Sequence, residues 1–559
     1  MTTLTGGQAL AQQLQKEGLT EIFCIPGVQL DWAVEGLREL GDAVRLYIPR
    51  HEQTTSYMAD GYARSSGRIG VCMTVPGPGL TNAMAGLSTA YACNAPLLSI
   101  TGQIHSATIG AGYGMLHEIR DQSALVGSVT KWRGLARSPA QIPALVRQAV
   151  QTIRTGAPQP VGLEIPHDVL SSREAVQLIE PPADFDGRQA PSPASIAAAA
   201  ALLGQARNPF IYAGGGVIAA EASAALTRLA ETLQAPVVSA EMGRGAISDR
   251  HELALNSLAG RALIRHADVV LVVGSRFMSR MAPVPLWTGP GVKFIYVNAD
   301  AQAASAPRRA DVFVHADAQL ALQALQAELS EQAGRRAPRA AMMRAARAWA
   351  EQQMAPIEPQ YGYARALRRA IPEDGILVNE LTQVGYFATL GYPVYGPRTL
   401  ISPGYQGTLG YGFPTALGVA VANRGRTVVS INGDGGFGWG LQELATARRY
   451  GLDLITVVFH DGHFGNVRLL QQQTFGQTIG VELCNPDYQK LADAFGVAGA
   501  LAHSPQELEE AIVRARERGG PALIEVRVGQ MPSAWHLFRF QSPFKAPAPE
   551  PADPVASFL

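Results

Sequence analysis

Short apolar segments alternate with helical segments along most of the chain. In the first third, helical periodicity covers residues 6–16 and about 53–64, and apolar runs lie between these helices. The runs expected to be strands span residues 21–25, 44–48, 70–75, 95–101 and 161–165. Because strands that are apolar throughout are buried on both faces, this alternation predicts a parallel sheet with helices on both sides.

The same alternation restarts twice. Residues 166–193 are rich in Pro, Asp and Glu and lack periodicity, which predicts a linker. Beyond it, strands are expected at 210–213, 236–239, 269–274, 294–297, 312–315, 375–379, 428–431 and 454–459, and a helix at 335–354. The predicted fold class is α/β, with three doubly wound domains with parallel sheets at 1–168, 190–335 and 360–540. The Pro- and Ala-rich tail, 541–559, is expected to be a disordered end or a flap.

The first and third segments share one layout of strand, Gly/Pro turn, helix and strand. Two related halves flanking a middle domain favour a site at their interface. In the middle segment, a strand runs into Gly214-Gly215-Gly216, a turn type that can hold a phosphate. A full GxGxxG pattern is absent there, so a plain doubly wound sheet is the favoured interpretation.

Composition narrows the class of protein. The 559 residues are 47% hydrophobic, and 46 Lys and Arg balance 46 Asp and Glu. No basic run is interleaved with aromatic residues, so no nucleic acid or anionic membrane partner is expected. The apolar stretches are far shorter than a membrane span, and the N-terminus lacks the pattern of a secretory signal. The four cysteines form no CxxC pair, which favours reduced thiols and a cytoplasmic location.

One stretch carries the strongest chemical signal. Gly433-Asp434-Gly435-Gly436 follows a buried strand, so it lies at the carboxyl edge of the predicted sheet, where ligands gather. Its glycines allow the backbone to approach an anion, and the next helix begins there. Asp461 follows the next strand. Two carboxylates, diphosphate oxygens and water would form an oxygen shell suited to Mg²⁺ or Ca²⁺. The alternative is a pair of turn aspartates without a metal.

Five motifs resemble those of thiamine-diphosphate-dependent (ThDP-dependent) enzymes, and the resemblance covers nearly the whole chain. They are the stretch at 433–437, His460-Asp461-Gly-His463-Phe-Gly465, Ile48-Pro-Arg-His-Glu52, the Gly/Pro turn at 74–82 and the Gly-rich turn at 407–415. The chain is most similar to the acetolactate synthase (acetohydroxyacid synthase) large-subunit group. The resemblance implies a pyrimidine-binding domain, a middle domain and a diphosphate-binding domain, in that order.

The resemblance also assigns roles to residues. It implies that Asp434, the side chain of Asp461 and the carbonyl of His463 hold Mg²⁺. The family more often has Asn at position 461, but Asp also supplies a hard oxygen ligand. Leu409 would be the bulky wedge that bends the cofactor. The cofactor-binding residues implied are Glu52, Pro26, Asn82, Gln383, Gly407, Leu409, Gly433, Gly435, Gly436 and Asp461.

Glu52 corresponds to the family's activating glutamate. A carboxylic acid that donates to the pyrimidine ring favours the imino form of the cofactor's exocyclic amine, and that imine takes the thiazolium C2 proton. A buried carboxyl beside a ring nitrogen can have the raised pKa that such proton transfer needs. Taken alone, Glu52 would be more simply a carboxylate near a helix dipole. The other motifs reverse that preference.

The substrate side departs from acetolactate synthases. His117 and Glu118 stand where that group usually has Phe and Gln, Asn466 replaces a usual Met, and Leu470 replaces a Trp, whereas Lys131 matches. His117 is either a proton donor or aldehyde ligand, or only a pocket wall. Together with Glu52 and Gln122 it completes the predicted catalytic set. Residues 240–280 contain no clear counterpart of the flavin-holding loops, which makes FAD doubtful.

The expected function is a ThDP- and Mg-dependent carboligase or decarboxylase that acts on 2-oxo acids. Acetolactate formation from two pyruvates is the first hypothesis. A benzaldehyde-lyase-like enzyme or a 2-oxo-acid decarboxylase that forms acyloins is the alternative, and a non-catalytic cofactor-binding protein is a distant one. The partners implied are small 2-oxo acids and aldehydes. Because Glu52 and Asp434 lie on different domains that the family pairs across subunits, a homodimer or homotetramer is expected.

Overall fold

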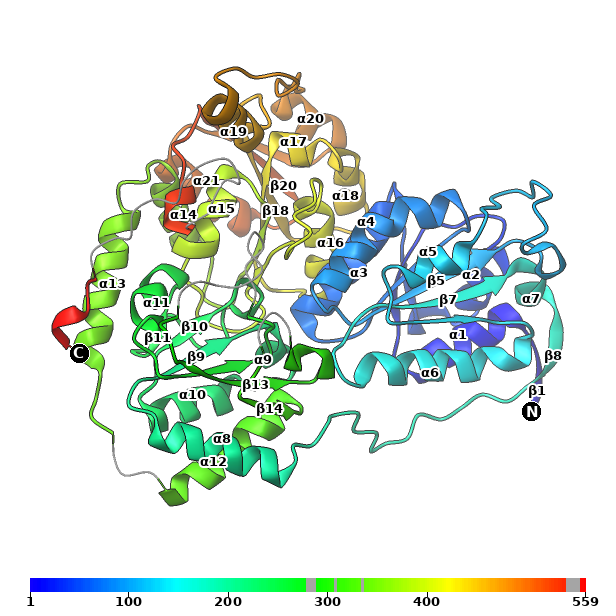
Figure 1. Cartoon of the computed structure of the whole chain (residues 1–559). Coiled ribbons are helices and arrows are strands. Elements are labelled where there is room, and N and C mark those ends of the chain that lie inside the picture. Colours follow the sequence, from blue (N-terminus) through cyan, green and yellow to red (C-terminus); the bar gives the residue numbers. More distant parts are fainter. Residues whose placement is uncertain (278–287, 306–308, 333–335, 539–552, 559) are drawn as a thin grey trace.

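Three α/β domains make up the chain (Figure 1). The structure is a computed structural model that describes residues 1–277, 288–305, 309–332, 336–538 and 553–558. Each domain contains a six-stranded sheet whose strands all run parallel, with helices packed on the sheet. The predicted fold class is therefore confirmed.

The first domain has the strand order β3-β2-β4-β5-β7-β6. Its strands are β2 (Glu21–Cys24), β3 (Arg45–Tyr47), β4 (Gly70–Thr74), β5 (Leu97–Gln103), β6 (Trp132–Leu135) and β7 (Val161–Pro166). Its main helices are α1 (Gly6–Lys16), α2 (Asp31–Arg38), α3 (Glu52–Ser66), α4 (Pro78–Ala92), α5 (Gln122–Gly127) and α6 (Ile142–Arg154). After their carboxyl ends, β3 leads into α3, which begins at Glu52, and β4 leads into α4, which contains Asn82.

Part of the predicted linker is ordered secondary structure. Residues 167–176 form α7 (His167–Ser171) and β8 (Arg173–Val176), and β8 pairs antiparallel with β1 (Thr2–Thr5) at the N-terminus. The expectation of a linker is wrong for these residues. The pairing explains the difference, because Val176 is buried beside residues more than 160 positions away, and a local pattern cannot reveal such a partner.

The middle domain has the strand order β11-β10-β9-β12-β13-β14. Its strands are β9 (Pro209–Ala213), β10 (Val237–Ser239), β11 (Ala254–Leu255), β12 (Val269–Val273), β13 (Lys293–Asn298) and β14 (Val312–His315). Its helices are α8 (Pro193–Gln205), α9 (Gly215–Ala219), α10 (Ser223–Leu233), α11 (Ser257–Ile264), α12 (Ala318–Gln332) and α13 (Ala340–Met354). The two-residue strand β11 was not predicted, since so short a run gives no periodic signal.

The third domain has the strand order β16-β15-β17-β18-β20-β19. Its strands are β15 (Ile376–Asn379), β16 (Leu400–Ile401), β17 (Val428–Gly433), β18 (Leu454–His460), β19 (Ala498–Ala502) and β20 (Ala522–Arg527). Its helices are α14 (Gln360–Ala370), α15 (Gln383–Gly391), α16 (Gly412–Ala422), α17 (Asp434–Phe437), α18 (Leu444–Arg449), α19 (Gly465–Phe475), α20 (Tyr488–Phe495), α21 (Pro505–Arg518) and α22 (Trp535–Phe538). β17 and β18 are adjacent, as predicted, so Asp434 and Asp461 follow neighbouring strands.

Helices α3 and α16 join the first and third domains (Figure 1). A Cβ at Gly61 would lie 2.2 Å from the carbonyl oxygen of Thr415, and a Cβ at Gly418 would lie 1.9 Å from that of Met58. The two helix backbones therefore approach closely only because both positions lack a side chain. Residues of both domains share one buried cluster, in which Tyr57 packs against Tyr411. The helix that begins at Glu52 is thus held rigidly against the third domain.

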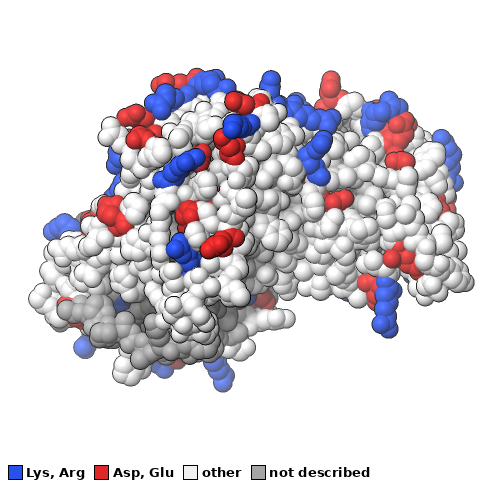
Figure 2. All heavy atoms as spheres, turned by 90° about the horizontal axis from the view of Figure 1, so that it is seen from above, with Lys and Arg blue, Asp and Glu red and all other residues white. Residues whose placement is uncertain are grey.

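Charged side chains of both signs lie on the surface, and the described part of the tail packs on the middle domain. Figure 2 shows one face on which Lys and Arg are interspersed with Asp and Glu. No helix within the described residues combines the length and apolar character of a membrane span. Residues 541–552 of the predicted tail lie outside the described residues. Residues 553–558 pack on the middle domain, where Asp553 pairs with His266 at 2.6 Å and Val555 is fully buried.

Candidate active site

Asp434 is the centre of the turn that follows β17. Its side chain is 2% exposed, and Gly433 precedes it as the cap of the short helix α17. One carboxylate oxygen accepts the N–H of Gly435 at 3.0 Å. The other accepts the N–H of Gly462 and the Nδ2 of Asn485, both at 2.7 Å. Asn485 was not predicted, since it lies 51 residues away in a loop without a motif.

Asp461 and His463 lie in the neighbouring turn after β18. The Oδ1 of Asp461 accepts the His463 N–H at 2.9 Å, and the His463 ring nitrogen Nδ1 lies 2.8 Å from the Asp461 carbonyl oxygen. A Cβ at Gly465 would lie 2.6 Å from the Asp461 Oδ2 and 3.8 Å from the Cγ of Gln383. The structure therefore brings the predicted residues Asp461, His463 and Gln383 to one edge of the sheet.

The two carboxyl groups on these neighbouring turns suit a cation. Burial raises the pKa of Asp434 above its ordinary value. Burial also raises the pKa of Asp461, and the negative charge of Asp434 raises it further. A divalent cation between the two carboxylates would reverse both effects. The described residues contain no group of three His, Cys, Asp or Glu side chains arranged for a metal, so two carboxylates, a carbonyl and the diphosphate would have to form the shell.

The glycines of this turn are needed for packing as well as for access. A Cβ at Gly435 would lie 2.7 Å from the ring of Phe464, and a Cβ at Gly436 would lie 1.9 Å from the Oε1 of Glu380. At Gly433 the nearest atom would be 3.6 Å away, which is ordinary contact. Because these neighbours leave no room for a Cβ, positions 435 and 436 require glycine.

Glu380 is a buried carboxyl group that lies between the turns at 407–412 and 433–436. It follows β15, it is 2% exposed, and its Oε1 accepts the Gly410 N–H at 3.0 Å, while its Oε2 has no hydrogen-bond partner. Burial raises its pKa to about 8, although the Gly410 and Gly412 N–H groups oppose the shift. Glu380 was not predicted, since one acidic residue after a strand is not a motif.

The turn at 407–412 lies beside this carboxyl. Gly407 and Gly410 have φ angles of 58° and 75°, a backbone conformation that glycine adopts without strain. Between them, the Thr408 hydroxyl lies 2.8 Å from the Tyr57 hydroxyl of α3, and Leu409 is 44% exposed. Leu409, the predicted wedge, therefore lies on a turn that the Thr408–Tyr57 contact holds against α3. Gln383 begins α15, which is capped by the Thr382 hydroxyl 2.9 Å from the Gly385 nitrogen.

Glu52 and Asn82 form the other half of the candidate site. Glu52 is the first residue of α3, where the Nδ1 of His51 accepts the Gln53 N–H at 3.1 Å. The Nδ2 of Asn82 donates to the Glu52 carboxylate at 3.0 Å. Both residues come from the edge of the first sheet, so the structure brings these two predicted residues together.

A loop next to this half carries His117. Pro26 is exposed in the turn after β2, and Gln29 of the same turn connects to the loop. The Gln29 side chain lies 3.1 Å from the His117 Nδ1 and donates to the Leu116 carbonyl at 3.1 Å. Glu118 accepts three backbone N–H groups at 2.7–3.0 Å, which fixes the loop between residues 112 and 118. Gln29 was not predicted, because 88 residues separate it from His117.

Gln122 lies inside the first domain. Its side chain is 3% exposed, and its Oε1 accepts the Gly77 N–H at 2.9 Å. Its Nε2 donates to the Gly102 carbonyl at 2.9 Å and to the buried Glu164 at 3.0 Å. The amide is fully engaged in holding the turn that begins α4. A catalytic role for Gln122 stays a prediction.

Asn466 and Leu470 lie on α19, which follows the Asp461 turn. The Trp535 Nε1 of α22 donates to the Asn466 Oδ1 at 2.9 Å, and the Trp535 ring packs on Tyr386 with 4.7 Å between centroids. The C-terminal segment thereby fixes one wall beside the predicted metal turn.

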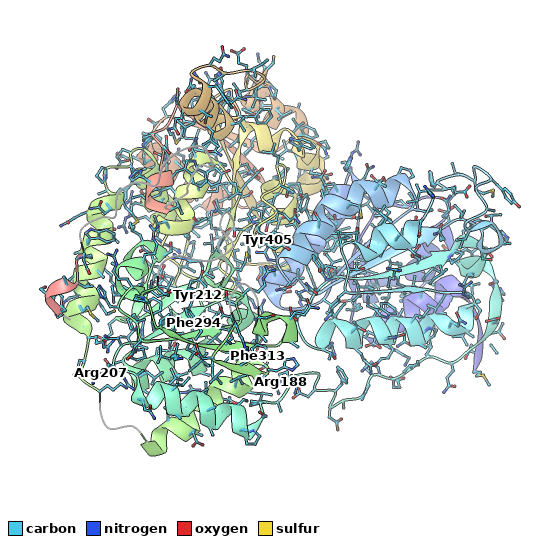
Figure 3. The ribbon with its side chains drawn as sticks, in the orientation of Figure 1. Arg188, Arg207, Tyr212, Phe294, Phe313 and Tyr405 are labelled. Carbon is cyan, nitrogen blue, oxygen red and sulfur yellow. The ribbon has the colours of Figure 1, made fainter. Side chains whose placement is uncertain are left out.

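A separate cavity of about 1320 Å³ is lined by residues of all three domains. Gly214, Asn298 and Arg398 line it, as do Tyr212 and Tyr405, which Figure 3 labels. None of the residues predicted to hold ThDP is among its described lining. Residues 278–280 of the interval 240–280 lie outside the described residues. FAD stays doubtful as a prediction.

The two half-sites fit ThDP and a divalent cation. The buried pair Asp434 and Asp461 has raised pKa values that a cation would lower. Thiamine diphosphate supplies the complementary groups, a diphosphate for the metal and a pyrimidine ring for a carboxyl such as Glu52.

Comparison with known proteins agrees with this geometry. Residues 4–125 match the N-terminal TPP binding domain of thiamine pyrophosphate enzymes, 196–325 match the central domain, and 381–526 match the C-terminal TPP binding domain. Thiamine pyrophosphate (TPP) is another name for ThDP. The matches contain Glu52 and Asn82 at one end and Asp434 and Asp461 at the other.

Three relatives cover nearly the whole chain. A probable 2-ketoarginine decarboxylase of Pseudomonas aeruginosa is 34% identical over 94% of both chains. A probable acetolactate synthase large subunit of Methanocaldococcus jannaschii is 31% identical over 94% of this chain and 92% of its own. The acetolactate synthase isozyme 3 large subunit of Escherichia coli is 29% identical over 93% of both. With three matching domains in the same order, this chain belongs to the thiamine-diphosphate-dependent enzymes and resembles their acetolactate synthase group.

Proposed function

We propose that this enzyme uses ThDP and Mg²⁺ to cleave the bond between the carboxyl and carbonyl carbons of a 2-oxo acid. The observation that carries the proposal is the presence of two half-sites in one chain, one with Asp434 and Asp461 on adjacent turns and one with Glu52 held by Asn82. The first half suits a metal-bound diphosphate. The second presents a carboxyl group to a ring nitrogen.

Each group has a defined task in this proposal. Asp434 and Asp461 hold the cation, with the His463 carbonyl as a third ligand, and the turn at 433–436 binds the diphosphate. Leu409 would contact the cofactor from a turn that Glu380 holds through the Gly410 N–H. When bound, ThDP would supply the nucleophilic carbon and the electron sink that loss of CO₂ requires. Glu52 holds and returns the proton that this activation requires.

The active unit is proposed to contain two copies of the chain. Large apolar side chains are exposed around both half-sites, and such patches are typical of interaction surfaces. They are Val28, Tyr113 and Leu116 in the first domain and Leu409, Trp439, Val467, Phe475 and Ile479 in the third, with exposed fractions of 44–83%. A homodimer or homotetramer in which Glu52 of one chain meets Asp434 of another would cover them. A cytoplasmic location stays a prediction.

The acceptor separates two versions of the reaction. In the acetolactate synthase version, a second pyruvate captures the carbon unit and yields 2-acetolactate. In the decarboxylase version, a proton takes its place and an aldehyde leaves. The second version is favoured by the departures at Asn466 and Leu470 and by the similarity to the probable 2-ketoarginine decarboxylase. A benzaldehyde-lyase-like cleavage of hydroxyketones is the remaining alternative.

Product analysis tests the proposal. The purified protein with ThDP and Mg²⁺ is given pyruvate, 2-oxobutyrate, 5-guanidino-2-oxopentanoate, phenylglyoxylate or benzoin. Release of CO₂ with 2-acetolactate supports the synthase version, and CO₂ with the shortened aldehyde supports the decarboxylase version. Benzaldehyde from benzoin without any CO₂ release would contradict 2-oxo acid cleavage. Omission of Mg²⁺ after chelation is the control, and undiminished turnover would remove the metal from the proposal.

A further inference from the structure

Glu443 is a buried carboxylate that none of the predicted motifs includes. It ends the short 3-10 turn Leu441–Glu443 in the third domain, and its exposed fraction is 0%. Both of its oxygens accept the Arg50 N–H, each at 3.0 Å. It also accepts the Thr446 hydroxyl at 2.5 Å.

A second group of the third domain holds the same segment. The Tyr450 hydroxyl, just after α18, accepts the Ile48 N–H at 2.7 Å. Its ring packs on Tyr47 at 4.9 Å between centroids. The backbone from Ile48 to Arg50 is therefore fixed at both ends by side chains from the other domain.

Glu52 lies two residues beyond this segment. Backbone N–H groups ahead of a helix have no partner within the helix, so a carboxylate that accepts them fixes where the helix begins and which way its first side chain points. Arg50 and Glu443 are 393 residues apart in sequence. The contact is thus a specific long-range one and not a local cap.

We propose that Glu443 is a positioning residue that sets the direction of Glu52 from across the domain boundary. This inference rests on the proposed function, in which the Glu52 carboxyl meets a cofactor held by the partner chain. Under that arrangement, Glu443 serves a different catalytic centre from Asp434 of its own domain. The third domain of each chain would then hold one cofactor and aim the glutamate that activates the other.

The Glu443→Gln variant tests the contact itself. Its amide N–H₂ would face the Arg50 N–H and Thr446 hydroxyl, so donors would oppose donors in a buried position. In the protein without cofactor, amide hydrogen exchange of residues 48–54 should become faster, while residues 433–437 stay unchanged. The Tyr450→Phe variant, which keeps the ring contact, should show a smaller increase. Glu517→Gln, an exposed position on α21, is the control with the same loss of charge.

The Glu443→Gln variant should slow the activation of ThDP without weakening its binding. The Glu443→Gln holoenzyme should exchange the C2 proton of bound ThDP about 10- to 100-fold more slowly, since small misplacements of a catalytic group have effects of that size. Its affinity for ThDP with Mg²⁺ should stay within about twofold of the wild-type value. A twofold change corresponds to a free energy of RT ln 2, which is small beside the cost of a lost metal ligand. A parallel fall in affinity would overturn the proposal, because a residue that only directs Glu52 should leave the metal and diphosphate site intact.

Mixed dimers locate the centre on which Glu443 acts. One chain carries Glu52→Gln, the other carries Asp434→Ala, and different tags allow purification of the hybrid. The hybrid keeps one complete centre, built from Glu52 of the second chain and Asp434 of the first. Glu443→Gln should slow this centre when it is added to the Asp434→Ala chain, and leave it unchanged when it is added to the Glu52→Gln chain.

Each outcome has a separate meaning. Equal loss in both placements, or loss only in the Glu52→Gln chain, would overturn the inference. A parent hybrid without any activity would instead contradict the shared site of the proposed function. In that case, unchanged amide exchange at residues 48–54 in Glu443→Gln would still overturn the positioning role, and faster exchange would support it.

Discussion

The Glu380 carboxyl accepts the Gly410 N–H at 3.0 Å and occupies the space beside Gly436. One buried acid therefore touches both the turn that presents Leu409 and the turn that begins with Asp434. The pKa of Glu380 is set by burial and by the N–H groups of Gly410 and Gly412. Among the described residues, no positively charged side chain contributes to it.

This environment makes stability depend on pH. The pKa of Glu380 is raised to about 8 in the folded protein, from 4.5. Between these values the folded chain holds a proton that the unfolded chain releases, so the contribution of Glu380 to stability is present below about pH 4.5 and is lost as pH rises through about 8. Glu380→Gln imitates the protonated form and should remove this loss.

Denaturation midpoints at pH 5.5, 7.0 and 8.5 measure the effect. The difference in unfolding free energy should move in favour of Glu380→Gln by up to about 1.4 kcal/mol per pH unit. Glu517→Gln, at an exposed position, provides the baseline. If the curves of Glu380→Gln and the wild type run parallel across this range, the carboxyl does not hold its proton.

A methyl group at position 436 should displace Glu380. The new Cβ would lie 1.9 Å from the Glu380 Oε1, and the carboxyl cannot stay bonded to Gly410 at its present place. We expect Gly436→Ala to destabilise the protein by about 1–3 kcal/mol, the usual range for overpacking, and to weaken ThDP binding.

Gly433→Ala is the matched comparison for folding. Its nearest atom would be 3.6 Å away, and a φ of −84° is open to alanine. Thermal unfolding should therefore separate the two variants. Glu380→Ala should partly restore the stability of Gly436→Ala, because it removes the colliding group, and strict additivity of the two changes would argue against their contact.

The sequence predicted the sheets and turns far better than the contacts behind them. Mostly apolar runs located β9, β12, β17 and β18, because strands buried on both faces carry few polar residues. The two-residue strands β11 and β16 gave no signal. The pairing of β8 with β1 also gave none, since it depends on residues at opposite ends of the first domain.

The candidate site shows the same division. Turn motifs placed Glu52, Asp434 and Asp461 at strand ends, and the structure brings each to the expected edge. The groups that hold these turns and their neighbours are Asn485, Gln29, Glu380 and Glu443, which lie 30 or more residues from their partners and belong to no motif. Long-range hydrogen bonds depend on the folded chain, so spacing alone cannot reveal them.

Binding of Mg²⁺ should weaken as pH falls. The carboxylates of Asp434 and Asp461 must be ionised to hold a cation, and burial raises the pKa of both. We therefore expect the loss of affinity to begin at a higher pH than for ordinary aspartates. Calorimetric titration of Mg²⁺ in the presence of ThDP, at several pH values, measures it.

Variants of the two aspartates divide the effect. Asp434→Asn removes the more enclosed carboxylate and should abolish Mg²⁺-dependent ThDP binding. Asp461→Asn keeps an oxygen ligand, removes the repulsion between like charges, and should retain binding with a shallower pH dependence. Equal affinity in Asp434→Asn and the wild type would remove the metal assignment.

Donor selectivity should depend on the contact between Trp535 and Asn466. The Trp535 Nε1 donates to the Asn466 Oδ1 at 2.9 Å, which fixes the side chain of a residue that departs from the acetolactate synthase pattern. Trp535→Phe keeps a ring on Tyr386 but frees the Asn466 amide. We expect the ratio of kcat/KM for a long 2-oxo acid to that for pyruvate to change by about 3- to 10-fold, a typical size for one pocket contact. ThDP affinity should not change, because neither residue lies on the turns at 407–412 or 433–437.

Gln530→Ala is the matched control, since Gln530 joins the same C-terminal segment to α19 through Gln472 at 2.9 Å, away from Asn466. If both variants alter the ratio equally, general loosening of the segment is responsible; if only Trp535→Phe does, the Asn466 amide is part of the wall that selects the donor.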